Sequence, residues 1–164
     1  MSQAIVASTF NRVVSQVMAF DMADVKQAYA KRSGLSPQLV DLHEREIKRY
    51  LALCIADPEA CYGMFSDADA LWHEFLCHTS KYWDFCFSIG GRFLHHIPTS
   101  SDAAQAILAS EGPSPRQQTI AAYEKHFGPM DPSLWRISDP LRADDCCTIC
   151  TSDKKLYLPS ASSH

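Results

Sequence analysis

Apolar residues recur along most of this chain at intervals of three and four positions, the spacing that places side chains on one face of an α-helix. The clearest row runs through Val40, Ile47 and Leu51. It begins after Ser36-Pro37, a typical helix start, and stops at Asp57-Pro58. Similar signals predict helices over residues 3–18, 21–32, 36–56, 102–110 and 115–126.

The segment 66–96 is predicted to be helical as well. Ser66-Asp67-Ala68-Asp69 matches a capping box, so a helix should open there and carry the aromatic stretch over residues 70–86. The apolar row continues over residues 81–96, and Pro98 ends it. Gly90-Gly91 interrupts this row at a cost of roughly 2 kcal/mol relative to alanines, which predicts a kink or a close helix contact.

Strand signals are nearly absent, since the chain has no alternating run of β-branched residues and no Asn-Gly or Asp-Gly turn. We therefore predict an all-α fold, a compact single-domain bundle of about five to seven helices over residues 1–138. Residues 139–164 are rich in Pro, Ser and Asp and contain cysteines. They are predicted to form an irregular or flexible tail.

Composition excludes several classes of protein. The 164 residues are enough for one domain with a hydrophobic core, and a net charge of −4 argues against a nucleic-acid partner. The first twenty residues have no cationic start, and Asn11 and Arg12 interrupt their apolar character. We expect no signal peptide, no membrane partner and a cytoplasmic location.

The helix from residue 66 carries a candidate metal site. Asp69, His73 and Cys77 follow one another at intervals of four, so they form one row on the helix. A carboxylate, an imidazole and a thiolate are all competent ligands for zinc or iron. His73 and His78 are five residues apart, about 140° around a helix, which excludes the zinc-protease motif.

Such a row needs further ligands from a second element. His95 and His96, at the end of the helix predicted over residues 81–96, are the first candidates, and His43 is another. His43 also lies on an apolar row, where a histidine is more often a hydrogen-bonded core residue. Trp72, beside His73, lies on the apolar face of its helix. Both a ligand role and a packing role for these residues stay open.

The tail holds a separate group of thiols, Cys146, Cys147 and Cys150, out of seven cysteines in the chain. Cys147 and Cys150 form a C-x-x-C pair, which is half of a zinc knuckle, and no second pair completes it. The group could bind a soft metal with help from Cys61, His164 or another chain. It could equally be a reactive segment without a metal.

Two stretches of the chain resemble a known group of proteins. They are "LWHEFLCHTSKYWDFCFSIGGRFLHHIPT" and the later "YEKHFGPMDPSLW". They resemble small uncharacterised bacterial proteins with a Trp-His-x-Phe…His-His-x-Pro pattern, which are distantly similar to the core of the glycine-rich domain-containing family. The resemblance covers about residues 36–135 and implies a helical fold. It implies that Trp72, His73, His95, His96 and Pro98 are defining positions, and it implies no activity.

Three functions remain open. The first is a small accessory or binding protein that holds zinc or iron at a histidine-rich site and presents a metal, a peptide or a protein partner. The second is a structural module for protein–protein interaction, with packed histidines and no cofactor. The third is a metal-dependent enzyme; the chain has no Gly-x-Ser-x-Gly, Gly-rich phosphate loop or Walker motif to indicate a specific reaction.

Overall fold

A computed structural model describes residues 3–137 and 148–152 of the chain. Its helices are α1 (Gln3–Ala19), α2 (Ala23–Ser33), α3 (Pro37–Ala56), α4 (Asp69–Cys77), α5 (Thr79–Phe85), the π-helical turn η1 (Cys86–Gly90), α6 (Asp102–Leu108) and α7 (Pro115–Phe127). The strands are β1 (Tyr62–Met64), β2 (Leu94–Pro98) and β3 (Thr148–Ser152). The described chain is predominantly helical, which confirms the predicted fold class.

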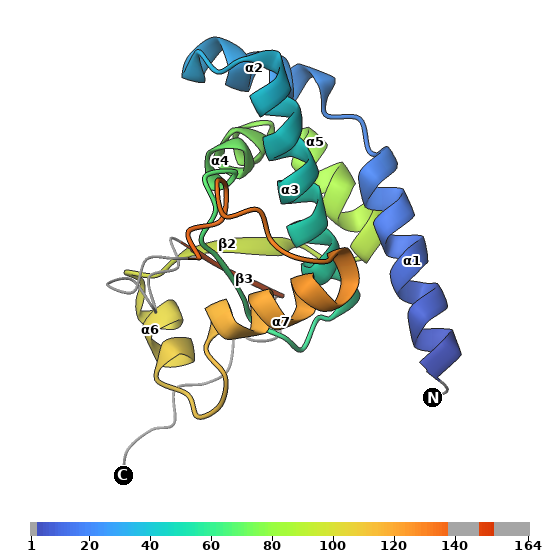
Figure 1. Cartoon of the computed structure of the whole chain (residues 1–164), viewed down its shortest axis with the longest axis vertical. Coiled ribbons are helices and arrows are strands. Elements are labelled where there is room, and N and C mark those ends of the chain that lie inside the picture. The colour runs from blue at the N-terminus through green and yellow to red at the C-terminus, as the bar shows by residue number, and fades with distance from the viewer. Residues whose placement is uncertain (1–2, 138–147, 153–164) are drawn as a thin grey trace.

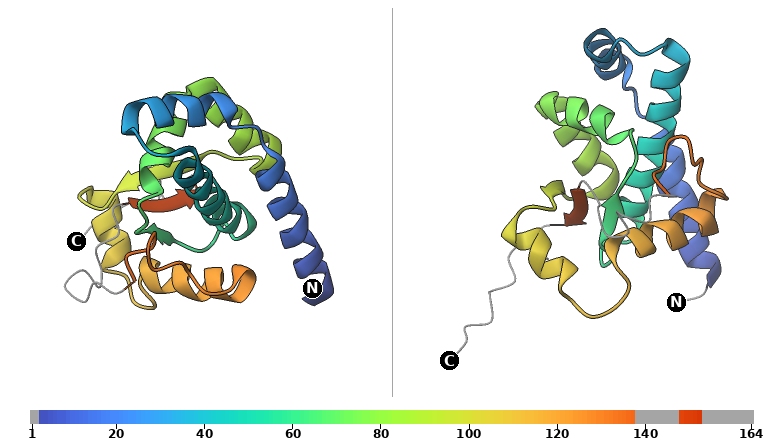
Figure 2. Two further views of the ribbon diagram at one scale, coloured as in Figure 1. Left: turned by 45° about the horizontal axis from the view of Figure 1, so that its top comes forward. Right: turned by 60° about the vertical axis from the view of Figure 1, so that its left-hand side comes forward.

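Helix α3 is the central element, and the other helices are arranged around it (Figure 1). It begins where the sequence predicts: Ser36 caps it by accepting a hydrogen bond from the Leu39 amide, and Pro37 is its first residue. Helix α1 lies along one side of α3, and α2 lies across one end (Figures 1 and 2). None of the described helices combines the length and the apolar character needed to cross a bilayer.

A small antiparallel sheet adds to the helical fold, and the sequence did not predict it. The strand order is β1-β3-β2, so β3 is the central strand. Tyr62 and His96 both pair with Cys150, from opposite sides of β3. Helices α4 and α5 lie on one side of the sheet, and α6 and α7 lie on the other (Figures 1 and 2). Five residues of the predicted irregular tail are therefore an ordered strand.

The single helix predicted over residues 81–96 is wrong in its second half. Helix α5 passes into η1, and Gly91 then ends the helical path in a left-handed conformation with φ 65°. The chain continues as β2, so His95 and His96 lie on a strand. The capping box predicted at residues 66–69 is also wrong, since Ser66 accepts from the Ala68 amide and α4 has no side-chain cap.

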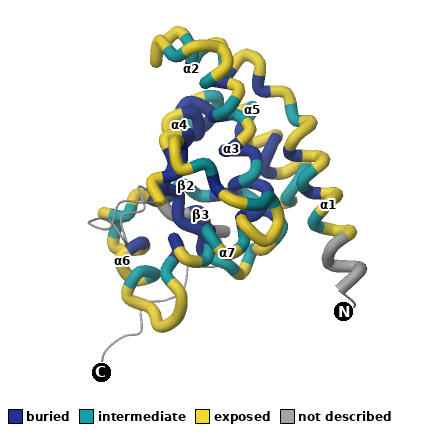
Figure 3. The backbone as a smooth tube through the Cα atoms, in the orientation of Figure 1, coloured by how far each residue is buried: buried dark blue, intermediate teal, exposed yellow. Residues whose placement is uncertain are grey.

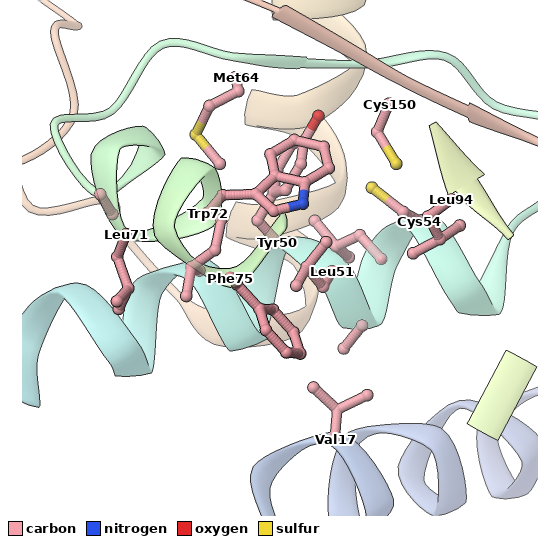
Figure 4. Packing of buried hydrophobic residues seen from close by; sticks show 14 of the residues in the cluster. Val17, Tyr50, Leu51, Cys54, Met64, Leu71, Trp72, Phe75, Leu94 and Cys150 are labelled. Carbon is pink, nitrogen blue, oxygen red and sulfur yellow. The ribbon is translucent and has the colours of Figure 1, made fainter. Parts of the chain in front are cut away.

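The core lies between α3, α4 and the sheet, where burial is greatest along the backbone (Figure 3). Trp72 of α4 is completely buried and packs against Tyr50 of α3 at a ring distance of 5.6 Å (Figure 4). Phe75, one turn further along α4, packs edge-on against Tyr82. The aromatic stretch of the sequence is therefore mainly core.

Candidate metal site and adjoining cavity

Asp69 and His73 lie one turn apart on α4, as their spacing predicts. The Oδ2 atom of Asp69 is 3.5 Å from Nε2 of His73. Asp69 is buried, whereas 57% of the His73 side chain is exposed. The pair therefore reaches from the interior to the surface of the protein.

His96 of β2 completes a group of three. Its Nε2 atom lies 3.1 Å from Oδ1 of Asp69, and its ring lies 4.4 Å from the ring of His73. One potential ligand atom from each of the three residues lies within 4.8 Å of the others. All three residues are metal candidates predicted from the sequence, and tertiary folding brings them together.

The orientation of His96 is restricted by the core behind it. The Trp72 ring packs edge-on against the His96 ring at 4.4 Å. Trp72 Nε1 donates a hydrogen bond to the Tyr82 hydroxyl, which in turn donates to the carbonyl of Leu94 on β2. Burial raises the pKa of Tyr82, so its hydroxyl keeps its proton and remains a donor. Trp72 therefore acts as a packing residue behind the site and is not a surface for a partner.

The chemistry of this group suits a divalent transition metal. Two imidazole nitrogens and one carboxylate oxygen are the donor set of many zinc and non-haem iron(II) sites. His73 Nε2 lies 3.5 Å from Oδ2 of Asp69 and His96 Nε2 lies 3.1 Å from Oδ1, so each imidazole is about as far from one carboxylate oxygen as neighbouring ligands are around tetrahedral zinc, about 3.3 Å. Three protein ligands would leave at least one coordination position for another molecule.

A cavity of about 500 Å³ adjoins the group. It is lined by Tyr29, Leu35, Leu39, His43, Ser66, Asp67, Asp69, Ala70, His73, Ser133, Leu134 and Arg136. Two of the three candidate ligands, Asp69 and His73, are part of its wall. The guanidinium of Arg136 binds Asp67 through Nε at 3.1 Å and Nη2 at 2.7 Å, so these opposite charges neutralise each other.

His43 lies on the wall of the same cavity but outside the metal group. It is buried on α3, and its Nδ1 atom is 2.9 Å from the hydroxyl oxygen of Tyr29. Burial lowers the pKa of His43, and the negative charge of Asp67 opposes this effect only in part. His43 is therefore a neutral, hydrogen-bonded residue near pH 7.

The structure separates His95 and Cys77 from the metal group. His95 follows the alternation of β2 away from His96, and its ring contacts Phe93 at 5.1 Å. Cys77 is exposed at the end of α4 and lines another hollow, together with Asp24 and His78. Eight residues along a helix correspond to a rise of about 12 Å, which is too far for Cys77 to reach an ion held by Asp69.

Of the three tail thiols, the structure describes Cys150 alone. Cys146 and Cys147 lie outside the described residues. Cys150 is buried in β3 beside Cys54, and their sulfur atoms face one another (Figure 4). Burial raises the pKa of the Cys150 thiol, and its hydrogen bond with Cys54 adds to this effect. Cys150 is thus a core thiol in this structure.

Glu46 of α3 is a buried carboxylate that was not predicted from the sequence. Its Oε2 accepts hydrogen bonds from Trp135 Nε1 at 2.9 Å and from the Tyr123 hydroxyl, and its Oε1 faces the guanidinium of Arg49 at 3.2 Å. The sequence held a signal for its burial: Glu46 lies three residues after His43, which is on the apolar row of α3, so both face the same side of the helix. The network joins α3 to α7 and to the segment around Trp135.

The chain belongs to the UCP032817-like family, whose model matches residues 11–112. The match includes Asp69, His73 and His96, and it ends before α7, Trp135 and β3. No curated protein and no solved structure matches the chain. The family description names no activity, and the predicted similarity to the glycine-rich domain-containing core stays a prediction.

Proposed function

We propose that this protein is a metal-binding accessory protein that holds one zinc or iron(II) ion through Asp69, His73 and His96. The observation that carries the proposal is the convergence of these three side chains, from α4 and β2, within 4.8 Å. A group of two imidazoles and one carboxylate needs no additional ligand from the chain to bind such an ion.

The setting of the three side chains supports this function. The buried Trp72–Tyr82 hydrogen bond keeps His96 in place, and the helix keeps Asp69 beside His73. Ligands that are already positioned lose little conformational freedom when an ion binds. The exposure of His73 leaves one side of the site open to solvent, so a bound ion would be accessible to a partner that completes its coordination.

Metal titration of tag-free protein tests the proposal. Wild-type protein is expected to bind one equivalent of zinc, measured by competition with a chromophoric chelator. His73→Ala and His96→Ala should each lower the affinity at least about 100-fold, since loss of even an outer-sphere partner costs about 10–100-fold. Asp69→Asn should lower it as well, because the amide lacks the negative charge.

His95→Ala is the matched control, because it removes a neighbouring histidine that points away from the site. It should leave the zinc affinity within about twofold of wild type. If wild-type protein binds no stoichiometric metal, or if His95→Ala weakens binding as much as His96→Ala, the proposal is wrong.

A second candidate function is a structural interaction module in which these histidines only pack. It is supported by the 3.1 Å contact between Asp69 and His96, which satisfies both side chains without an ion. In that case His96→Ala should destabilise the fold, and zinc should leave the thermal midpoint of the wild type unchanged. The same titration, followed by thermal unfolding, separates the two candidates.

A further inference from the structure

We infer that the cavity beside the metal site binds a carboxylate group carried on a short, branched apolar body. The inference rests on the proposed metal, which would bind the carboxylate at its open coordination position. Leu35, Leu39 and Leu134 would contact the apolar body. The carboxylate follows from the proposed metal, and the apolar body follows from the leucines that line the cavity.

The volume and the lining suit a small ligand. The cavity is partly open to solvent, and its volume of about 500 Å³ lies within the range of about 300–1,000 Å³ that is usual for small-molecule sites. Asp69 and His73 place the metal at its wall, and three leucines supply an apolar surface. An apolar wall with one strongly polar group, here the proposed metal, is typical of a site that fixes one end of a ligand.

The charges of the lining determine the sign of the ligand. Asp67 and Arg136 cancel each other through their two-point contact, and His43 is neutral because burial lowers its pKa. A divalent ion beside the single carboxylate of Asp69 would leave a local charge of about +1. A monoanion would neutralise it, and a carboxylate is the common monoanion whose oxygen binds zinc and iron.

Three polar groups of the lining already have hydrogen-bond partners, within the lining or beside it. The Tyr29 hydroxyl meets His43, Ser133 Oγ donates to Asp131, and Ser66 Oγ accepts from the Ala68 amide. Arg136 is the one lysine or arginine side chain among the described residues around the cavity, and Asp67 neutralises it. Without the metal the local charge would be about −1, from Asp69, and a carboxylate would be repelled. Binding should therefore depend strictly on the metal.

Cobalt(II)-loaded protein tests the inference, because its visible absorption changes when a new ligand enters the coordination sphere. The probe is 4-methylpentanoate, and its neutral analogue is 4-methylpentanamide. The acid should change the cobalt spectrum and saturate, and the amide should bind at least about tenfold more weakly. Isothermal titration of metal-free protein with the acid should show no binding.

A pair of leucines on α3 provides the matched variants. Leu39 lines the cavity, whereas Leu42 is partly buried outside it. Leu39→Ala should weaken 4-methylpentanoate about tenfold and leave acetate nearly unchanged, because acetate has no body to contact the leucine. Leu42→Ala should affect neither probe, and both variants should keep the wild-type metal affinity.

The carboxylate could belong to a free acid or to the C-terminus of a peptide. Acetyl-Gly-Gly-Leu and its C-terminal amide distinguish these sources. Binding of the peptide acid as tightly as 4-methylpentanoate indicates a peptide C-terminus, and binding of 4-methylpentanoate alone indicates a free acid. Either result supports the carboxylate chemistry.

The failure of the inference is distinguishable from failure of the proposed function. The inference is wrong, and the metal site stands, if the protein binds cobalt but 4-methylpentanoate leaves the cobalt spectrum unchanged. The same conclusion follows if the amide binds as tightly as the acid. If no metal binds, both are wrong. Equal binding of the acid to metal-free protein would also overturn the inference.

Discussion

Asp69 and His96 lie 27 residues apart in the sequence, and in the structure Oδ1 of Asp69 is 3.1 Å from Nε2 of His96. Asp69 is the first residue of α4, and His96 lies in the middle of β2. The contact ties the start of this helix to the sheet. A metal ion at this point would therefore connect two elements of the fold.

Metal binding should stabilise the protein. Zinc in 100-fold excess over its dissociation constant is expected to raise the free energy of unfolding by about 2.7 kcal/mol. Thermal unfolding with and without zinc measures the shift, and addition of a chelator should reverse it. Asp69→Asn should show no comparable shift with zinc. An equal shift in this variant would mean that the ion stabilises the fold from another position.

The buried carboxylate of Glu46 should be important for stability. Glu46→Gln keeps the size of the side chain, but its amide NH₂ replaces an oxygen that accepts from Trp135 or faces Arg49. Changing one partner of a buried charge network should lower the free energy of unfolding of the protein by about 3 kcal/mol. Urea denaturation measures the loss. Glu124→Gln, at an exposed position on α7, is the control and should change stability by less than about 0.5 kcal/mol.

Adjacent glycines should respond differently to alanine. Gly91 has φ 65°, and an alanine there would cost roughly 1–2 kcal/mol in the left-handed conformation. Gly90 has an ordinary backbone, and an added Cβ would lie 3.4 Å from the Ile55 side chain, a normal van der Waals contact. Gly90→Ala should therefore be nearly neutral in urea denaturation. Equal losses in the two variants would contradict this assignment of their roles.

The buried histidine should make stability depend on pH. Burial lowers the pKa of His43 below the ordinary value of 6.5, so the unfolded chain takes up a proton near pH 6 that the folded protein does not. The free energy of unfolding should therefore fall as the pH decreases from 6.5 to the lower folded pKa, and level off below it.

His43→Gln should reduce this fall, because glutamine does not titrate and can still bond to Tyr29. Denaturation at pH 7.5 and 5.5 measures the effect. His126, whose pKa is also lowered by burial, contributes in the same direction and leaves a residual slope. An unchanged slope in His43→Gln would show that folding does not lower the pKa of His43.

Thiol reactivity should follow burial. Cys77 is exposed, whereas Cys54, Cys86 and Cys150 are buried, and burial raises the pKa of Cys86 to about 11. N-ethylmaleimide reacts with thiolates, so among these four described cysteines native protein should be modified first at Cys77 and at the three buried residues only after unfolding. Peptide mapping by mass spectrometry identifies the sites. Rapid labelling of Cys150 in native protein would contradict its place in the core.

Local signals in the sequence were enough for most helices. Ser36 and Pro37 specify the start of α3, and the spacing of its apolar residues specifies the buried face, because both signals act within a few residues of one another. The i, i+4 relation of Asp69 and His73 has the same origin. These features could be predicted because a helix satisfies its backbone within its own segment.

The rest depended on contacts between distant segments. The strands are three to five residues long, and each is stable only because β3 pairs with both neighbours, at a separation of 50 residues or more. No local pattern of such short strands distinguishes them from loops. The buried role of Cys150 and the network of Glu46 with Trp135 follow from the same distant packing.

For this protein, the sequence by itself determined most of the helices, the Ser36 cap of α3 and the presence of Asp69 and His73 on one face of α4. It also placed His95 and His96 among the candidates, without deciding between them. The tertiary structure made that choice: Gly91 turns the chain out of the helix, and the two-residue repeat of β2 directs His96 to Asp69 and His95 away from it. The reason is physical, because a strand reverses the direction of each successive side chain, whereas the predicted helix would have turned them by about 100°.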